Sequence, residues 1–206
     1  MRKIHHLGIA AAAGAALLVP SMLTQTAQAN AGDLVAHLQP VPVNGVDGGG
    51  TAWVSVRGTR IDVSMAANGL LADAPHAAHI HFGAQAMHEC PSAAADMDHN
   101  GFLTTSEGAG SYGPVVVSLT KTGDTSPAST LAIDRYDTAP GGDLAYQRGH
   151  IKVSQEVAKA ITEGLAVIVI HGVDHDGIPG YSGPASDLDP SLPTEATDPA
   201  LCGVIK

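Results

Sequence analysis

Hydrophobic and polar residues alternate along much of the chain. Residues 51–56 alternate, Gly58-Thr59 supplies a turn, and residues 60–65 alternate again, which predicts a β-hairpin. Further strands are expected at 76–82, 115–119, 129–134 and 166–171, with Gly- and Pro-rich segments between them. Many short strands joined by turns predict an all-β fold, a sandwich or a barrel.

Only residues 154–163 have helical composition, with Val157, Ala160 and Ile161 on one face and Gly164 placed as a C-terminal cap. Residues 184–199 are rich in Pro, Asp and Ser and are expected to form an ordered loop. We therefore expect one domain with one short helix and long loops.

The first 29 residues have the features of an export signal. Arg2 and Lys3 precede an apolar run at 7–18, and Ala27-Gln28-Ala29 fits a signal-peptidase site. The run is too short to span a bilayer. Cleavage after Ala29 would leave residues 30–206 as a single secreted, extracytoplasmic domain, although a retained leader would anchor it instead.

The charge balance excludes some partners. The chain has 10 Lys and Arg against 20 Asp and Glu, and removal of the leader would make it still more acidic. This balance argues against binding nucleic acid or anionic membranes and is compatible with binding cations.

The two cysteines are Cys90 and Cys202. An even pair in an exported chain predicts a disulfide. The alternative, a thiolate metal ligand, requires a second soft ligand nearby, and none is present.

Four histidines and Cys90 lie within the stretch HAAHIHFGAQAMHEC. On a strand, His79 and His81 point to the same face, and His171 ends the apolar run before it. Such an imidazole set suits copper or zinc. A histidine that ends a strand can equally be an ordinary surface residue.

Together these residues resemble the copper/zinc superoxide dismutases: His79-Ile80-His81, then Cys90, then His171, then the terminal LCGVI. The resemblance implies a Greek-key β-barrel in which His79, His81 and His171 hold copper and Cys90 pairs with Cys202. It also implies superoxide as substrate, with copper alternating between two oxidation states.

Residues 43–82, with TAWVSVRGTRIDVSMAANGL before HAAHIHFG, equally resemble a CHRD domain. This second resemblance implies a little-characterised β module. Its histidines would be vestigial or would bind metal without turnover.

The chain departs from the dismutase pattern at three places. Asp96 stands where the metal-bridging histidine is expected, so His99 becomes the candidate fourth copper ligand. No zinc loop follows, so zinc is not expected at a second site. The arginine that precedes the second cysteine in the dismutases is absent, which removes a cation that would attract superoxide.

Residues 96–107 match a twelve-residue calcium loop. Gly101 occupies the turn position, and Gly108 and Gly110 are expected to prevent an exit helix. The ligands would be Asp96, Asp98, Asn100, the Phe102 carbonyl, Thr104 and Glu107.

Asp174 and Asp176 follow His171 in an acidic turn. They form either an ordinary Asp-Gly turn or the partners that orient a ligand imidazole. The few Trp and Tyr residues do not indicate a sugar-binding platform, and no motif for hydrolytic chemistry is present.

Two functions follow from these patterns. The first is an exported metal-binding protein resembling copper superoxide dismutase, with superoxide as substrate if it is an enzyme. The alternative is a non-catalytic CHRD-like structural or binding module stabilised by calcium and a disulfide. The sequence indicates no protein partner.

Overall fold

The computed structural model describes residues 33–206, and the expected leader with its cleavage position after Ala29 lies outside them. The strands are β1 (Leu34–Pro40), β2 (Gly49–Arg57), β3 (Arg60–Asn68), β4 (Ala78–His81), β5 (Val115–Ser118), β6 (Leu144–Lys152), β7 (Val167–His171) and β8 (Pro199–Val204). The helices are α1 (Thr105–Tyr112), α2 (Gln155–Thr162) and α3 (Thr194–Thr197), and four 3-10 turns are η1 (Ala93–Ala95), η2 (Pro127–Ser129), η3 (Ile133–Arg135) and η4 (Pro140–Gly142).

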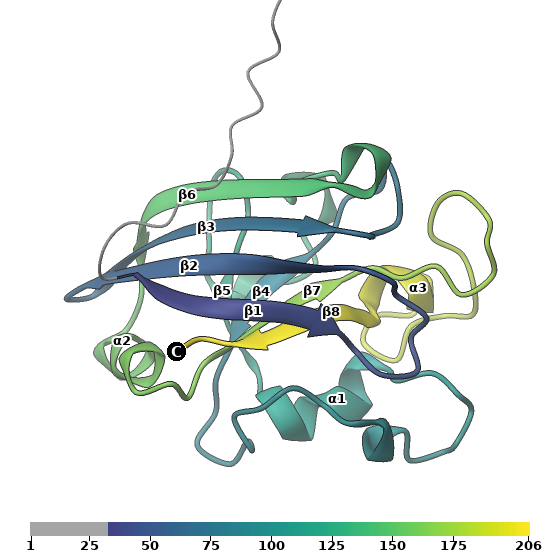
Figure 1. The fold of residues 1–206 in the computed structure, drawn as a ribbon, viewed down its shortest axis with the longest axis horizontal. Coiled ribbons are helices and arrows are strands. Elements are labelled where there is room, and N and C mark those ends of the chain that lie inside the picture. Colours follow the sequence, from purple (N-terminus) through teal and green to yellow (C-terminus); the bar gives the residue numbers. More distant parts are fainter. Residues whose placement is uncertain (1–32) are drawn as a thin grey trace, which may run out of the picture.

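The eight strands form one antiparallel sheet in the order β5-β4-β7-β8-β1-β2-β3-β6. The sheet curls into a half-barrel, so that β2, β3 and β6 lie over β4, β5 and β7 (Figure 1). The connections from β3 to β4, from β5 to β6 and from β6 to β7 cross between these two halves. The all-β prediction is therefore confirmed.

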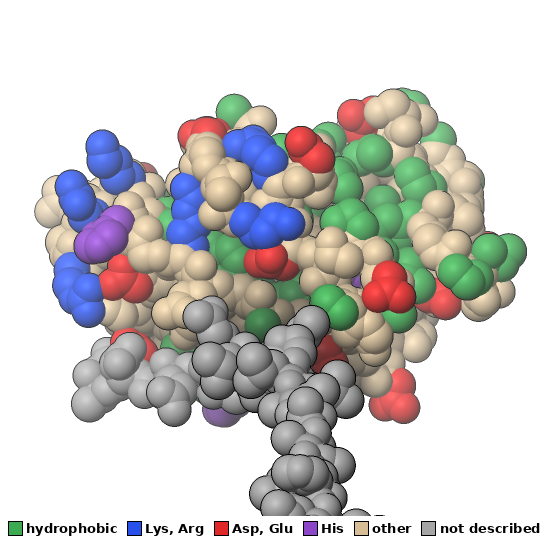
Figure 2. All heavy atoms as spheres, turned by 90° about the horizontal axis from the view of Figure 1, so that it is seen from above, with side chains coloured by type: hydrophobic (Ala, Val, Ile, Leu, Met, Phe, Trp, Pro, Cys, Tyr) green, Lys and Arg blue, Asp and Glu red, His purple; other side chains and the backbone are tan. Residues whose placement is uncertain are grey.

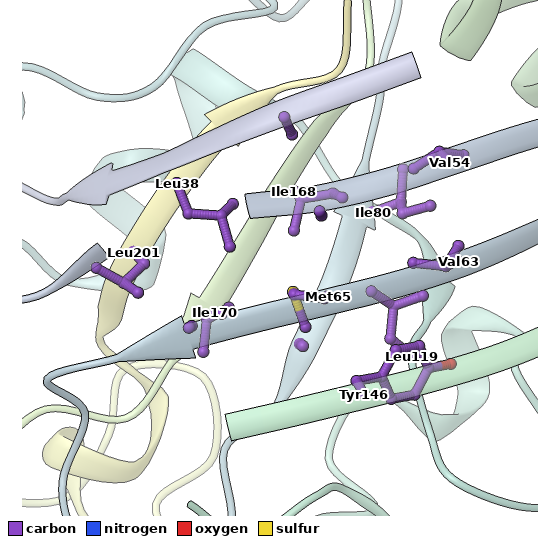
Figure 3. Close-up of a cluster of buried hydrophobic side chains, with 14 of the residues drawn as sticks. Leu38, Val54, Val63, Met65, Ile80, Leu119, Tyr146, Ile168, Ile170 and Leu201 are labelled. Atoms are coloured by element: carbon purple, nitrogen blue, oxygen red, sulfur yellow. The ribbon is translucent and has the colours of Figure 1, made fainter. Parts of the chain in front are cut away.

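The main core fills the space between the two halves of the sheet (Figure 3). Each strand contributes alternate residues, because successive side chains of a strand point to opposite faces. Ten of these side chains, labelled in the figure, come from both halves: Leu38, Val54, Val63, Met65, Ile80, Leu119, Tyr146, Ile168, Ile170 and Leu201.

Strands β4 and β7 are covered on both faces, and every residue in them is buried. Ile80, Ile168 and Ile170 face the main core. On the other face, Val167 and Val169 join a second hydrophobic cluster with Leu103 and Tyr112. The loops and α1 therefore create a second buried layer outside the sheet.

The two end strands, β5 and β6, are linked by side chains. Arg148 on β6 donates hydrogen bonds to the Thr120 carbonyl (2.6 Å) and hydroxyl (2.8 Å), just beyond β5. The Tyr146 hydroxyl donates to the same carbonyl at 3.4 Å. These bonds satisfy polar groups at an edge that would otherwise lack a ladder partner.

One predicted strand is absent, and several elements were not predicted. Residues 129–134 form 3-10 turns and not a strand, because Ser126 caps the turn through Ala128 N and Asp124 accepts from Ser129. The sequence also did not predict β1, β6, β8 and α3.

The exit helix after the acidic loop does form, contrary to the sequence prediction. Thr104 and Glu107 make a reciprocal capping box at the start of α1, which satisfies free backbone N–H groups. Gly108 is required where it stands, because a Cβ there would lie 2.6 Å from the Tyr112 hydroxyl. Packing of Tyr112 thus offsets the poor helix propensity of the glycines.

The predicted disulfide between Cys90 and Cys202 is present. Cys202 lies on β8, between β7 and β1, so the bridge fastens the loop that follows β4 to the middle of the sheet. Disulfides are typical of proteins that fold in oxidising compartments. Within residues 33–206, no helix combines the length and apolar character that a membrane span requires.

We expect replacement of both cysteines (Cys90→Ala with Cys202→Ala) to lower the free energy of unfolding by about 4 kcal/mol, because the bridge closes a long loop in the unfolded chain. Urea denaturation would measure the difference. Dithiothreitol should weaken the wild type by a similar amount and leave the double variant unchanged. An equal response of both proteins would contradict the assignment.

Candidate metal centre

The pairing of β4 with β7 brings three histidines onto one face of the sheet. His79 lies opposite Val169, and His81 lies opposite Val167. Directly opposed residues share a face, and His171 is two residues beyond Val169 on the same strand. His79, His81 and His171 therefore face the second buried layer together, with ring centroids 5.0 to 5.9 Å apart.

Helix α1 and its flanks cover this histidine cluster. The Tyr112 ring lies 4.6 Å from the His81 ring, centroid to centroid. The Thr105 hydroxyl lies 3.3 Å from His171 Nδ1 and donates to the Thr197 carbonyl. As a result, the three histidine residues are only 2 to 3% exposed.

Hydrogen bonds fix the proton position on each ring. His81 Nδ1 lies 2.8 Å from the Gly113 carbonyl, and His171 Nδ1 lies 2.6 Å from the Thr197 carbonyl. His79 Nε2 lies 3.1 Å from the Thr130 carbonyl and 2.9 Å from the Tyr136 hydroxyl. A carbonyl oxygen only accepts, so each of these nitrogens carries the hydrogen and donates.

The other nitrogen of each neutral ring is then an acceptor. These atoms, His79 Nδ1, His81 Nε2 and His171 Nε2, are buried and have no hydrogen-bond partner. Leaving one buried acceptor unsatisfied costs about 1–3 kcal/mol, so three together require an explanation. One water molecule has two O–H donors and could satisfy only two of these three acceptors, whereas a single metal ion can accept all three lone pairs.

The spacing fits a single ion. The three histidines offer ring nitrogens that all lie within 4.8 Å of one another. Metal–nitrogen bonds of about 2.0 Å place neighbouring ligands roughly 3.3–3.6 Å apart, so small side-chain movements would suffice. The donor set therefore fits a three-histidine metal centre.

Burial also keeps these rings neutral. Burial, with repulsion from the His171 ring, lowers the pKa of His81 to about 3, and burial lowers the pKa of His171 to about 4. For His79, burial and then repulsion from His171 and His81 hold the pKa well below its ordinary value. Neutral imidazole is the form that binds metal.

The predicted calcium loop adopts a turn closed by its own side chains. Asp96 accepts from the backbone N–H groups of Asn100 (3.2 Å) and Gly101 (3.1 Å). Glu107 accepts from Met97 N and Thr104 N, both at 2.9 Å. Carboxylate oxygens of Asp96, Asp98 and Glu107 lie within 4.8 Å of one another.

The remaining predicted ligands lie in the same loop. The side chain of Asn100 accepts from Phe102 N at 2.8 Å. Gly101 has φ +86°, a left-handed conformation that glycine adopts at little cost. Thr104 contributes its hydroxyl to the capping box and not to the turn.

His99 does not join the histidine cluster. It is exposed on the acidic loop and lies outside the group formed by His79, His81 and His171. The loop turns back on Asp96 and Asp98, and His99 stands at its tip with a φ of 56°. The structure therefore does not bring His99 together with the three other predicted copper ligands.

Asp174 and Asp176 do not orient the imidazoles. They are exposed and accept from Gly177 N and Ile178 N of their own turn. With Glu195 they form a separate group of carboxylates. The partners that orient the rings are backbone carbonyls, together with the Tyr136 hydroxyl, and a sequence carries no signal for a carbonyl partner.

We expect the free energy of unfolding of the metal-free protein to fall as the pH decreases below about 6.5, by about 1.4 kcal/mol per pH unit for each buried histidine. The unfolded chain takes up protons there, whereas His81 and His171 in the folded chain do so only near pH 3 to 4. Urea denaturation with a chelator at several pH values measures this slope.

His81→Gln should reduce that slope by about 1.4 kcal/mol per pH unit, the contribution of one buried histidine. His37 is exposed, so His37→Gln should leave the slope unchanged. Equal unfolding free energies at pH 7 and pH 5 in the wild type would show that the cluster is not buried in the neutral form.

Comparison with known proteins bears on the two resemblances. Residues 26–178 match the family model of the CHRD domain. No curated protein and no solved structure matches the chain, and the comparisons give no evidence for the copper/zinc superoxide dismutase family. Because the CHRD match extends over well more than half of the chain, the protein belongs to the CHRD domain family.

Proposed function

We propose that this CHRD domain is an exported metal-binding module whose ion is held by His79, His81 and His171. The observation that supports this proposal is the set of three buried ring nitrogens without hydrogen-bond partners. Each ring is fixed by a hydrogen bond on its far side, as metal-ligating histidines generally are.

Copper is the metal we propose for this site. Imidazole ligands suit copper and zinc, but zinc with three protein ligands normally keeps a water molecule in an open fourth position. The histidines are buried beneath α1, and cuprous copper accepts three-coordination. When bound, copper would supply an ion able to exchange one electron, and the chain's own residues would fix its ligands and exclude water.

We propose that the domain retains copper and does not turn over superoxide. A dismutase must admit an anion to its metal, whereas the ligands here are 2 to 3% exposed. The chain also has a net charge of −10, which repels anions. Dismutation remains the alternative to be tested on the same sample.

The test is to load the metal-free protein with copper or zinc, remove excess metal, and determine the bound metal by elemental analysis. We expect one equivalent of copper to remain bound. In a separate denaturation measurement with free copper at a hundred times the Kd, we expect the free energy of unfolding to increase by about 2.7 kcal/mol. His81→Gln should abolish both effects, and His37→Gln should change neither.

Failure to bind copper or zinc in a folded wild-type protein would refute the metal centre. Superoxide consumption that depends on bound copper and is lost in His81→Gln would refute retention without turnover.

We further propose that the acidic loop binds calcium, as a second and independent ion site. Asp96, Asp98 and Glu107 bring carboxylate oxygens together, and calcium prefers such oxygen ligands. Glu107 also completes the capping box at the start of α1, so calcium would stabilise the helix that covers the histidine cluster. Its role would be structural.

We expect millimolar calcium to raise the melting temperature of the wild type and to have little effect on Glu107→Gln. Glu156→Gln, an exposed acidic residue on α2, provides a control with the same charge change. An equal response to calcium and magnesium, or an unchanged response in Glu107→Gln, would contradict a specific calcium site.

A further inference from the structure

Three of the few cationic side chains lie together. Strand pairing places Arg57 directly opposite Arg60, and Arg60 directly opposite Lys152, at one end of β2, β3 and β6. All three are exposed. On the face seen in Figure 2, Lys and Arg side chains gather over one half of the view with a His side chain among them. We call Arg57, Arg60 and Lys152 the cationic row.

The cationic row is unfavourable by itself. Like charges directly opposite one another on a sheet destabilise it, and the chain has only 10 Lys and Arg with which to form such a row. Asp62 offsets Arg57 through an ion pair. Arg60 and Lys152 have no ion-pair or hydrogen-bond partner for their side chains among residues 33–206.

A β-bulge holds a histidine beside the cationic row. The pairing of β3 with β6 shifts register between Ile61 and Val63. His150 in this bulge has φ 58°, and its N–H donates to Asp62 at 2.7 Å. A non-glycine residue in this conformation is strained, and such strain is found more often at functional sites than elsewhere.

A second row, formed by Trp53, Ser64 and Gln147, crosses the same face of the sheet. Trp53 lies opposite Ser64, which lies opposite Gln147. Ala52 and Val54 face the core, so the half-buried Trp53 points outward with the cationic row. It is the only tryptophan in the chain. Four residues along a strand separate the two rows, a distance of about 13 Å.

A hollow of about 260 Å³ connects these rows. Its lining includes Trp53, Ser64 and Gln147 from one row and Arg57 from the other, with His150 between them. Asp33 and Asp62 also line it, but Asp62 is already engaged by Arg57 and by His150 N–H. An aromatic ring, neutral polar groups, cations and two carboxylates thus line one open surface.

We propose that this outer face of β2, β3 and β6 binds an acidic oligosaccharide. Trp53 would stack against the apolar face of a sugar ring, and Ser64 and Gln147 would hydrogen-bond its hydroxyl groups. The cationic row would pair with carboxylate or sulfate groups farther along the chain, because guanidinium groups bind such anions well. The two rows are farther apart than one sugar ring can span.

Both chemical features of the ligand are required. A polyanion without sugar rings would use the cationic row and leave Trp53 without a function. A neutral glycan would use Trp53 and leave Arg60 and Lys152 unpaired. Charge complementarity on an otherwise acidic protein favours the anionic glycan. The proposal does not depend on the metal centre, which lies on β4 and β7.

The test uses the intrinsic fluorescence of Trp53, which reports on this face alone. The probes are tetragalacturonate, a sulfated heparin tetrasaccharide, neutral cellotetraose and inorganic polyphosphate of similar length. We expect at least one acidic oligosaccharide to change the fluorescence saturably and with salt-dependent affinity. The two acidic sugars distinguish carboxylate from sulfate. Absence of binding to both, or equal binding by cellotetraose or polyphosphate, would overturn the proposal.

Variants test the two rows separately, with affinity measured by calorimetry. Arg60→Gln with Lys152→Gln should weaken binding about tenfold, as expected for two exposed ion pairs. Lys159→Gln with Lys206→Gln removes the same charge from residues near α2 and should leave affinity unchanged. Trp53→Leu should weaken binding while circular dichroism stays unchanged. Equal weakening by the Arg60/Lys152 and the Lys159/Lys206 double variants would indicate nonspecific charge attraction and overturn the proposal.

Discussion

The antiparallel register between β4 and β7 determines the rest of the candidate centre. A shift of one residue would turn His79 and His81 into the main core and Ile80 out of it. The main core prevents this shift, because Ile80 packs with Ile168 and Ile170 between the two halves of the sheet. The hydrophobic packing on one face of these strands therefore fixes the histidine positions on the other.

Helix α1 and its flanks cover the histidine cluster on the side away from the sheet. Helix α1 follows the acidic loop directly, provides Thr105 and Tyr112 against the histidines, and ends at the Gly113 carbonyl that accepts from His81. The disulfide at Cys90 ties the segment before this loop to β8. The acidic loop and the histidine cluster thus share one helix, whereas the cationic row lies on the hairpin end of other strands.

Several strands could be predicted from the sequence, but the way in which they pair could not. Alternation predicted β2 and β3, and the apolar run ending at His171 predicted β7. The pattern in residues 144–152 was obscured by the bulge at His150, where two residues of β6 interrupt the register. A helix at 105–112 was rejected on glycine propensity, because the packing of Tyr112 over Gly108 is a tertiary effect.

The three histidines were identified from residue type and spacing. That they converge could be seen only from the pairing register of β4 with β7. The partners Gly113, Thr130 and Thr197 act through backbone carbonyls, so their side chains give no indication of the role. The outer-face rows were missed for a similar reason. Trp53 shares a row with Gln147, and Arg60 pairs with Lys152, only through strand pairing across about ninety residues.

The position of β8 has a consequence for folding. This last strand lies in the middle of the sheet, between β7 and the first strand, β1. Neither pairing can form until the C-terminal residues are available, so the sheet has a high contact order and should fold slowly. A chain with this topology cannot complete its sheet until its last strand is available.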